Sequence, residues 1–188
     1  MVAKEIISNE KEIISTDNKR LFNEARAFAI KAHGNQQYGV SPYEIHLGNV
    51  ISVLMRFNVD LSSTYKLNLL IAAWLHDVLE DTKVTKAELE AKFGATVTEI
   101  VYTLSDDQGA SREERKVNFY KKIAKNEDAI IVKLADRISN VEFSIIHGNE
   151  RKLEIYKTEQ LKLEEVLIPV LKSALGLELL AYLRKLLK

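Results

Sequence analysis

The sequence of 188 residues predicts an all-α, single-domain protein. Apolar side chains recur every three to four residues over most of the chain, which is the period of an amphipathic helix. The capping-box pattern that starts helices occurs at residues 41–44, 85–88 and 111–114. With two prolines and seven glycines, the chain lacks the dense turns of an all-β domain.

Each expected helix has its own start or stop signal. Thr16 or Asp17 caps the first helix, Gly94 ends the fourth, and Pro169 and Gly176 interrupt the leucine-rich tail. The expected segments are, in order, residues 17–33, about 42–56, about 65–79, 85–94, a helix from 111, a helix through 130–137, and a tail over 161–187. We therefore expect an N-terminal arm over residues 1–16 and one helical domain over residues 17–188.

The helix expected over about residues 65–79 is apolar on almost every side, which places it at the centre of the domain. The leucine-rich tail fits a pair of helices that covers the core. An interface in a homo-oligomer is the alternative interpretation of the same leucines.

Composition narrows the function classes. Lys and Arg together number 27, as do Asp and Glu, so there is no basic excess for bulk binding to nucleic acid. Cysteine is absent, which excludes disulfides and thiolate chemistry. No apolar stretch reaches the ~20 residues that cross a bilayer, and the first residues do not form a secretory signal. We expect a cytoplasmic protein that binds neither nucleic acid nor membranes.

The residues best suited to chemistry lie at the end of the central apolar helix. His76 and Asp77 come first, and Glu80 and Asp81 follow one turn later on the same helix faces. Carboxylates this close repel one another, so they need a cation or water. A divalent metal with mixed nitrogen and oxygen ligands meets that need. A solvated polar helix end is the alternative.

Two further polar residues lie on apolar helix faces, where a partner is required. His46 is either a satisfied core histidine or a neighbour of the 76–81 cluster. Asp136 needs a partner because a lone buried carboxylate is costly, and its basic neighbours Lys133 and Arg137 compete with a metal for that role. A plausible four-ligand set combines two imidazoles and two carboxylates, from His46, His76, Asp77 and Asp136.

With these residues in this order, the sequence resembles the HD-domain metal-dependent phosphohydrolases. Within that family it is most similar to the hydrolase domain of RelA/SpoT-type proteins and to the stand-alone small alarmone hydrolases of the Mesh type. The most specific matches are His-Asp-x-x-Glu-Asp at 76–81 and Lys-Leu-Ala-Asp-Arg at 133–137. The resemblance runs over about residues 20–160 and is carried by residues 25–33, 41–46, 72–82, 93–95 and 132–140.

The resemblance implies an HD-domain helical bundle that holds a single Mn²⁺, or another divalent transition metal, through the four ligands His46, His76, Asp77 and Asp136. It also implies that Glu80 and Asp81 act on the attacking water, and that Asn140 helps to hold the nucleotide. The implied reaction removes pyrophosphate from the 3′ position of guanosine tetra- or pentaphosphate.

Other substrate contacts are expected from Tyr38, which can stack on a base, and from Arg115, whose charge suits a pyrophosphate. The basic residues around Arg115 also fit the solvated face of a surface helix. Tyr38 lies where relatives usually carry a basic cluster that packs on guanine, and Phe143 lies where a small polar residue or Asp is common.

These departures keep two alternatives open. One is an HD phosphohydrolase for another phosphorylated nucleotide, such as NADPH or an adenosine analogue. The other is a catalytically idle nucleotide-sensing module, which the presence of Glu80 and Asp81 disfavours.

Overall fold

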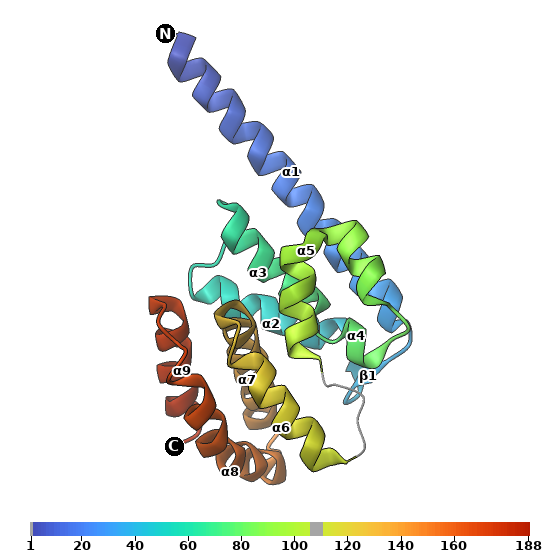
Figure 1. The fold of residues 1–188 in the computed structure, drawn as a ribbon, viewed down its shortest axis with the longest axis vertical. Helices are drawn as coiled ribbons and strands as arrows, with labels where there is room; N and C mark the ends of the chain where they lie inside the picture. The colour runs from blue at the N-terminus through green and yellow to red at the C-terminus, as the bar shows by residue number, and fades with distance from the viewer. Residues whose placement is uncertain (1, 106–110) are drawn as a thin grey trace.

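The structure, a computed structural model, is helical throughout apart from one small hairpin. It describes residues 2–105 and 111–188, with side chains described for residues 16–105, 111, 114–115 and 117–188. The elements are α1 Val2–His33, β1 Gln37–Tyr38, β2 Ser41–Pro42, α2 Glu44–Arg56, α3 Thr64–Leu75, α4 Val78–Asp81, α5 Lys86–Leu104, α6 Arg112–Ile123, α7 Glu127–Ile146, α8 Glu150–Leu167 and α9 Ala174–Leu186. The predicted all-α class is confirmed (Figure 1).

Helix α3 lies at the centre, as its apolar sequence predicts. It packs against α1, α2, α5 and α7, and its residues from Leu69 to Leu75 are all buried. Trp74 packs against α1, where its ring meets Phe22 edge-on at 5.9 Å between ring centroids. On the other side of the core, α7 packs against α2, α8 and α9. The central position of α3 and α7 is what brings their polar residues together.

The leucine-rich tail covers the core. Helices α8 and α9 both lie against α7, and Leu167, Leu179 and Leu183 are fully buried. Pro169 lies in the turn between the two helices, as expected. Gly176 does not interrupt the tail, because its N–H donates to Ser173 Oγ at the start of α9.

The expected helix start at Thr16 or Asp17 is wrong. Helix α1 is continuous from Val2 to His33, because residues 2–33 contain neither glycine nor proline. Asp17 instead lies within α1 and pairs with Arg20 at 3.6 Å. The N-terminal part of α1 projects beyond the other helices (Figure 1).

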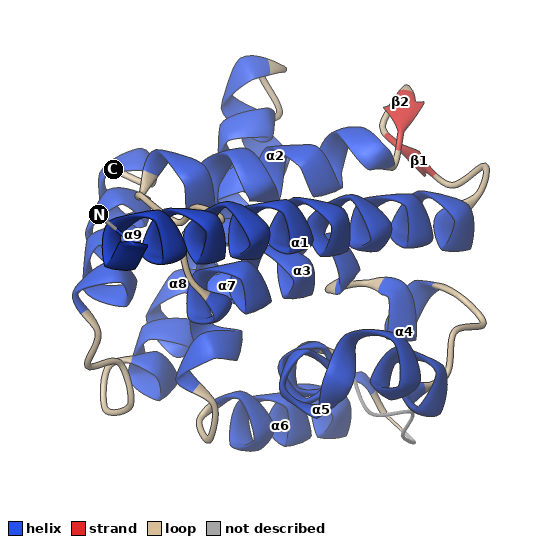
Figure 2. Cartoon of the chain, turned by 90° about the horizontal axis from the view of Figure 1, so that it is seen from above, coloured by secondary structure: helices blue, strands red, loops and turns tan. Residues whose placement is uncertain are grey.

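The expected capping box at residues 41–44 is also wrong. Ser41 lies in β2, opposite Tyr38 of β1, in a two-stranded antiparallel hairpin. Helix α2 begins at Glu44 with no side-chain cap, and the Glu44 carboxylate binds Arg26 of α1 instead. The hairpin lies where α1 ends and α2 begins (Figure 2).

The helix expected over residues 65–79 is two helices. Helix α3 ends at Leu75, and the short α4 begins at Val78. The break occurs where the His76 ring Nδ1 lies 2.8 Å from the Ala73 carbonyl and Asp77 adopts φ −102° and ψ −4°. The expectation that residues 76 and 80 share one continuous helix face is therefore wrong.

The other helix signals are largely confirmed. Thr85 and Glu88 form the complete capping box of α5, and Ser111 Oγ accepts from Glu114 N–H at the start of α6. Gly94 breaks the helical geometry with φ 79°, but α5 continues beyond this kink to Leu104. The capping boxes at 85–88 and 111–114 thus mark helix starts, whereas Gly94 bends α5 without ending it.

Candidate functional site

The structure brings the four predicted ligands together from two helices and one turn. His46 projects from α2, His76 and Asp77 lie at the turn between α3 and α4, and Asp136 projects from α7. His46 Nε2 is 3.3 Å from His76 Nε2 and 3.4 Å from Asp136 Oδ1. His76 Nε2 is 2.9 Å from Asp77 Oδ2 and 3.9 Å from Asp136 Oδ1. We call these four residues the His–Asp cluster.

The ring of His76 is oriented by the backbone. Its Nδ1 donates to the Ala73 carbonyl, because a carbonyl oxygen only accepts, and this leaves Nε2 as the atom facing the cluster. His46 also faces the cluster with Nε2, while its Nδ1 is buried without a partner among the described residues. Both rings are almost completely buried, at 2% and 4% exposure.

Asp136 has one of the basic partners that the sequence allowed, and its second oxygen faces the cluster. Lys133 Nζ binds Asp136 Oδ2 at 2.9 Å, so the ion pair with a basic neighbour exists. Oδ1 faces the other way, toward His46, and accepts from Asn140 Nδ2 at 2.5 Å. Arg137, the other basic neighbour, pairs with Glu159 instead. The ion pair thus leaves one oxygen of Asp136 turned to the cluster.

The charges of the cluster stabilise one another. Burial lowers the pKa of His46, but hydrogen bonds to Asp136 and Asp77 outweigh it and raise the pKa to about 9. Burial raises the pKa of Asp136, but Lys133 and the two imidazoles lower it far more, so this carboxyl stays ionised. The pKa of Asp77 is lowered for the same kind of reason, chiefly by His76. The cluster therefore contains two ionised carboxylates, and nearby positive charge stabilises them.

A divalent transition metal fits this set of donors. One nitrogen of each histidine and one oxygen of Asp77 all lie within 4.8 Å of one another. Two imidazole nitrogens 3.3 Å apart require a proton or a cation between them, because their lone pairs repel. Mixed imidazole and carboxylate ligands are typical of Mn, Fe, Co or Zn sites. Asp136 Oδ1 supplies a fourth donor beside the two histidines.

Glu80 and Asp81 lie on α4, directly after the cluster, and both are exposed. Their backbone N–H groups donate to the Asp77 carbonyl, which fixes α4 relative to this ligand. Asp81 Oδ2 accepts from Gln36 Nε2 at 2.8 Å. The catalytic roles of these two carboxylates remain predictions.

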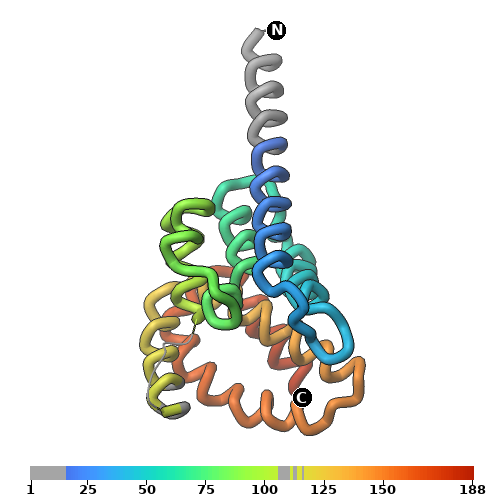
Figure 3. Tube along the Cα trace, turned by 90° about the vertical axis from the view of Figure 1, so that its right-hand side faces the viewer, coloured from blue at the N-terminus to red at the C-terminus, as the bar shows by residue number. Residues whose placement is uncertain are grey.

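Tyr38 lies over the cluster from the hairpin. Its ring stacks on His46 at 4.7 Å, and its hydroxyl donates to Asn140 Oδ1 at 2.7 Å. Phe143 meets the same ring at 4.5 Å, and the 34–42 segment passes beside the end of α7 (Figure 3). Two expected substrate contacts, Tyr38 and Asn140, thus bind each other beside the cluster. One face of the Tyr38 ring is covered by His46 and is not open to a base.

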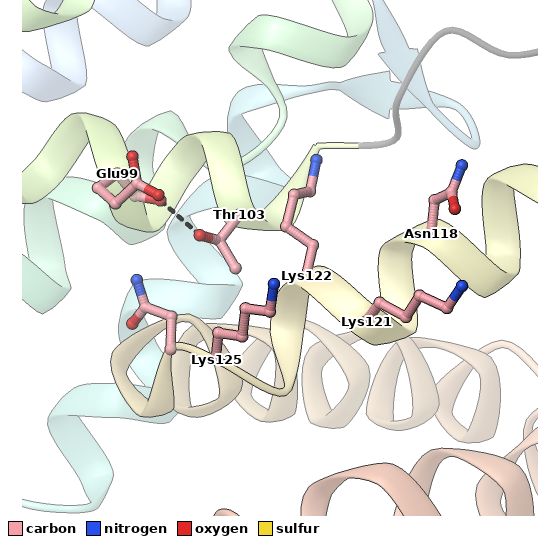
Figure 4. A pocket seen from close by; sticks show the side chains of 7 residues that line it. Glu99, Thr103, Asn118, Lys121, Lys122 and Lys125 are labelled. Atoms are coloured by element: carbon pink, nitrogen blue, oxygen red, sulfur yellow. Dashed lines mark hydrogen bonds between the residues drawn. The ribbon is translucent and has the colours of Figure 1, made fainter.

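Arg115 lies half-buried in the first turn of α6, and its contact with the substrate stays a prediction. A separate basic cavity of about 430 Å³ lies between α5 and α6 (Figure 4). The residues that line it are Glu99, Thr103, Asn118, Lys121, Lys122, Lys125 and Asn126. None of the predicted site residues is among them. Lys122 Nζ donates to the Ser105 carbonyl at 2.5 Å.

Sequence reasoning did not identify two residues that touch the candidate site. Tyr43 donates its hydroxyl to Asp77 Oδ2 at 2.5 Å, and Gln36 binds Asp81. Both lie in the segment that turns back over α4, and nothing in helical periodicity reveals such a return. The only signal was their place in the stretch that leads to His46.

The chain is similar over much of its length to known proteins. The HD-domain family model matches residues 25–162. The guanosine-3′,5′-bis(diphosphate) 3′-pyrophosphohydrolase of Aquifex aeolicus is 31% identical over 138 residues, which are 71% of this chain and 19% of that protein. The Drosophila melanogaster protein of the same name, MESH1, is 35% identical over 102 residues, which are 54% of this chain and 55% of that protein. The chain thus spans only part of these relatives.

Two solved structures share the fold. One, described as a metazoan ortholog of SpoT that hydrolyzes ppGpp, has a TM-score of 0.65 at 24% identity and covers 88% of this chain and 94% of that chain. The other, lmo0812 from Listeria monocytogenes EGD-e, has a TM-score of 0.61 at 23% identity and covers 78% and 94%. The predicted helical bundle of the HD type is therefore confirmed as the fold.

Proposed function

Because the chain belongs to the HD-domain family, we propose that it is a metal-dependent phosphohydrolase that removes the 3′ pyrophosphate from guanosine 3′-diphosphate 5′-(di/tri)phosphate. The observation that carries this proposal is the convergence of His46, His76, Asp77 and Asp136 on one point. The names of the relatives from Aquifex aeolicus and Drosophila melanogaster support the choice of substrate.

The proposed metal is Mn²⁺, with another divalent transition metal as the alternative. When bound, it would supply Lewis acidity, which lowers the pKa of a water and offsets charge on phosphoryl oxygens. The histidines hold it through Nε2, since the Nδ1 of His76 is bound to the backbone. Lys133 keeps Asp136 ionised by binding Oδ2, while Oδ1 faces the histidines.

The carboxylates of Glu80 and Asp81 orient the attacking water and accept its proton. Both are exposed, so their side chains face the solvent from which water and substrate arrive. Asn140, Tyr38 and Arg115 are the proposed contacts to the nucleotide. Asn140 binds Asp136 as well as Tyr38, so a nucleotide that engages it replaces the Tyr38 hydroxyl.

A different phosphorylated nucleotide is the second candidate substrate, and the structure gives one observation in its favour. Tyr38 stacks on His46 and meets Phe143, so an aromatic wall stands where relatives usually carry a basic cluster. NADPH or an adenosine analogue therefore belongs in the substrate panel. A catalytically idle nucleotide sensor is the third alternative.

The remaining expectations concern location and partners. Among the described residues, no helix is long and apolar enough to cross a membrane. We propose a cytoplasmic enzyme whose partner is a small nucleotide, without nucleic acid or membrane binding. The homo-oligomer, suggested by the leucine-rich tail, remains an open alternative, because Leu161 and Leu177 stay largely exposed.

The test is a phosphate-release assay on the purified protein loaded with Mn²⁺. We expect pyrophosphate from guanosine tetraphosphate, and we expect Glu80→Gln with Asp81→Asn to lower turnover by at least about 100-fold while metal content is unchanged, because general acid–base groups contribute that much. Glu90→Gln, on the exposed face of α5, serves as the control.

Each outcome has a clear meaning. Turnover of only NADPH or an adenosine nucleotide would select the second candidate. Nucleotide binding without any turnover would select the sensor. Unchanged turnover in the doubly substituted protein would remove the proposed roles of Glu80 and Asp81.

A further inference from the structure

We propose that His33, Gln36 and Tyr43 form one positioning unit that holds the carboxylates of Asp77 and Asp81 at the candidate site. This inference rests on the proposed function. None of the three residues is a proposed ligand or a proposed substrate contact. They act through the two carboxylates that they hold.

The first arm of the unit runs from His33 through Gln36 to Asp81. Gln36 Nε2 lies 2.8 Å from Asp81 Oδ2, and Gln36 Oε1 lies 2.8 Å from His33 Nδ1. An ionised carboxylate only accepts, so the amide nitrogen must face Asp81 and the amide oxygen must face the histidine. His33 Nδ1 is then a donor. Donor and acceptor are therefore assigned for both hydrogen bonds of this arm.

The second arm runs from His33 through Tyr43 to Asp77. The rings of His33 and Tyr43 stack at 4.5 Å between centroids, with 28° between their planes. The Tyr43 hydroxyl donates to Asp77 Oδ2. One imidazole, the last residue of α1, therefore contacts both side chains that reach the two carboxylates.

The surroundings make this unit stiff. His33 is 8% exposed, and the Gln36 backbone is bound at both ends, to the His33 carbonyl and to the Tyr43 N–H. Asp81, by contrast, is exposed and belongs to a helix of four residues. Its carboxylate would sample several rotamers if Gln36 did not hold Oδ2, and holding it leaves Oδ1 to face water.

The choice of an imidazole at position 33 has a cost that supports this role. His33 Nε2 is buried without a hydrogen-bond partner among the described residues. A phenyl ring would stack on Tyr43 equally well without that cost. The gain from histidine lies in the Nδ1 bond to Gln36, and thus in the arm that reaches Asp81.

The two arms predict different kinetic defects. Gln36→Leu should lower kcat about tenfold and change KM and metal affinity less than about twofold, because it frees Asp81 only. Tyr43→Phe should weaken metal binding about tenfold, since a partner behind a ligand tunes its affinity by such factors. His33→Phe keeps the stacking and should reproduce Gln36→Leu, with metal affinity preserved.

The matched control is Gln37→Leu, because Gln37 is the exposed neighbour of Gln36 in β1 and should leave every parameter unchanged. Metal affinity is measured by calorimetry, and the His33 tautomer by imidazole ¹⁵N NMR. Gln36→Leu and Asp81→Asn should both perturb the Nδ1–H signal of His33, and Gln37→Leu should not.

If the wild type is active and Gln36→Leu has the same kcat as Gln37→Leu, the inference is overturned while the proposed function stands. The same holds for a His33 signal that does not respond to Gln36→Leu. A wild type that turns over no phosphorylated nucleotide overturns the proposed function instead.

Discussion

At the scale of single residues, the site depends on how Asp136 is shared between two neighbours. Lys133 binds one oxygen, and His46 and Asn140 face the other. Burial disfavours the carboxylate, so the ionised form survives through these contacts, with Lys133 as the largest of them. A metal held by the cluster would therefore share this carboxylate with Lys133 as a second source of positive charge.

Lys133→Met is the variant that tests this sharing. Without metal, we expect it to lower the free energy of unfolding by about 3 kcal/mol, because one partner of a buried pair is lost. With saturating metal the loss should be smaller, since the metal supplies the missing positive charge. Urea titrations in chelator and in Mn²⁺ measure both values, and Lys125→Met, at an exposed position in the turn after α6, is the control. An equal loss in the two buffers would contradict the sharing of Asp136.

The residues of the His–Asp cluster were predictable from sequence because each has a residue-type signal. His76, Asp77 and Asp136 stand out as polar residues among apolar ones. Gln36 and Tyr43 carry no such signal. Their contacts to Asp81 and Asp77 join residues 45 and 34 positions apart, and only the path of the hairpin creates them.

At the scale of elements, helix ends depend on tertiary contacts that a local pattern does not contain. The capping box of α5 forms as predicted, because Thr85 and Glu88 need only each other. The expected box of α2 fails because Ser41 pairs with the hairpin and Glu44 with Arg26. The start of α7 shows the same dependence, because Glu127 accepts from the backbone N–H groups of residues 172 and 173 before α9.

Glu127→Gln tests this link between α7 and α9 through its pH dependence. Burial raises the pKa of Glu127, but the N–H groups of Ser173 and Lys172 outweigh it and lower the pKa below 4.5. A lowered folded pKa means that the stabilisation is present above the unfolded pKa and is lost as pH falls through the folded pKa. We expect Glu127→Gln to cost about 1 kcal/mol at pH 7, since it removes the charge from two hydrogen bonds.

That difference should shrink as the pH falls below about 4.5, where the unfolded chain begins to bind the proton. Urea unfolding at pH 7 and at a series of lower values measures it, and Glu178→Gln on the exposed face of α9 is the control. A difference that grows toward acid pH would show that the carboxylate is not held by these N–H groups.

At the scale of the whole molecule, the fold was predictable because its main signal is local and repeated. The helical period, the apolar α3 and the leucine-rich tail each point to one all-α core. The tail completes that core: Tyr182 of α9 donates to Glu142 of α7, which also binds Arg56 of α2. The convergence of α2, α3 and α7 on one point was permitted by the periodicity, but only three-dimensional packing shows it.

Leu183→Ala tests the contribution of α9 to the whole. Leu183 is fully buried, so we expect a loss of about 3 kcal/mol in the free energy of unfolding, from lost burial and the cavity left behind. Leu177→Ala, half-exposed on the same helix, should cost less than about 0.5 kcal/mol. Urea unfolding compares the two. Equal costs would indicate that α9 is not packed as a core element.

The interior of this bundle is mostly hydrocarbon, and two imidazoles and two carboxylates meet within it at one point. Leucine or methionine of similar volume at those four positions would fill the same space with less desolvation. A sequence redesigned on this backbone for stability alone would therefore replace these four residues first. The result would be a more stable protein that lacks the proposed metal site. Substitutions intended to raise thermal stability therefore have to spare the His–Asp cluster and be placed on the outer surfaces of the helices.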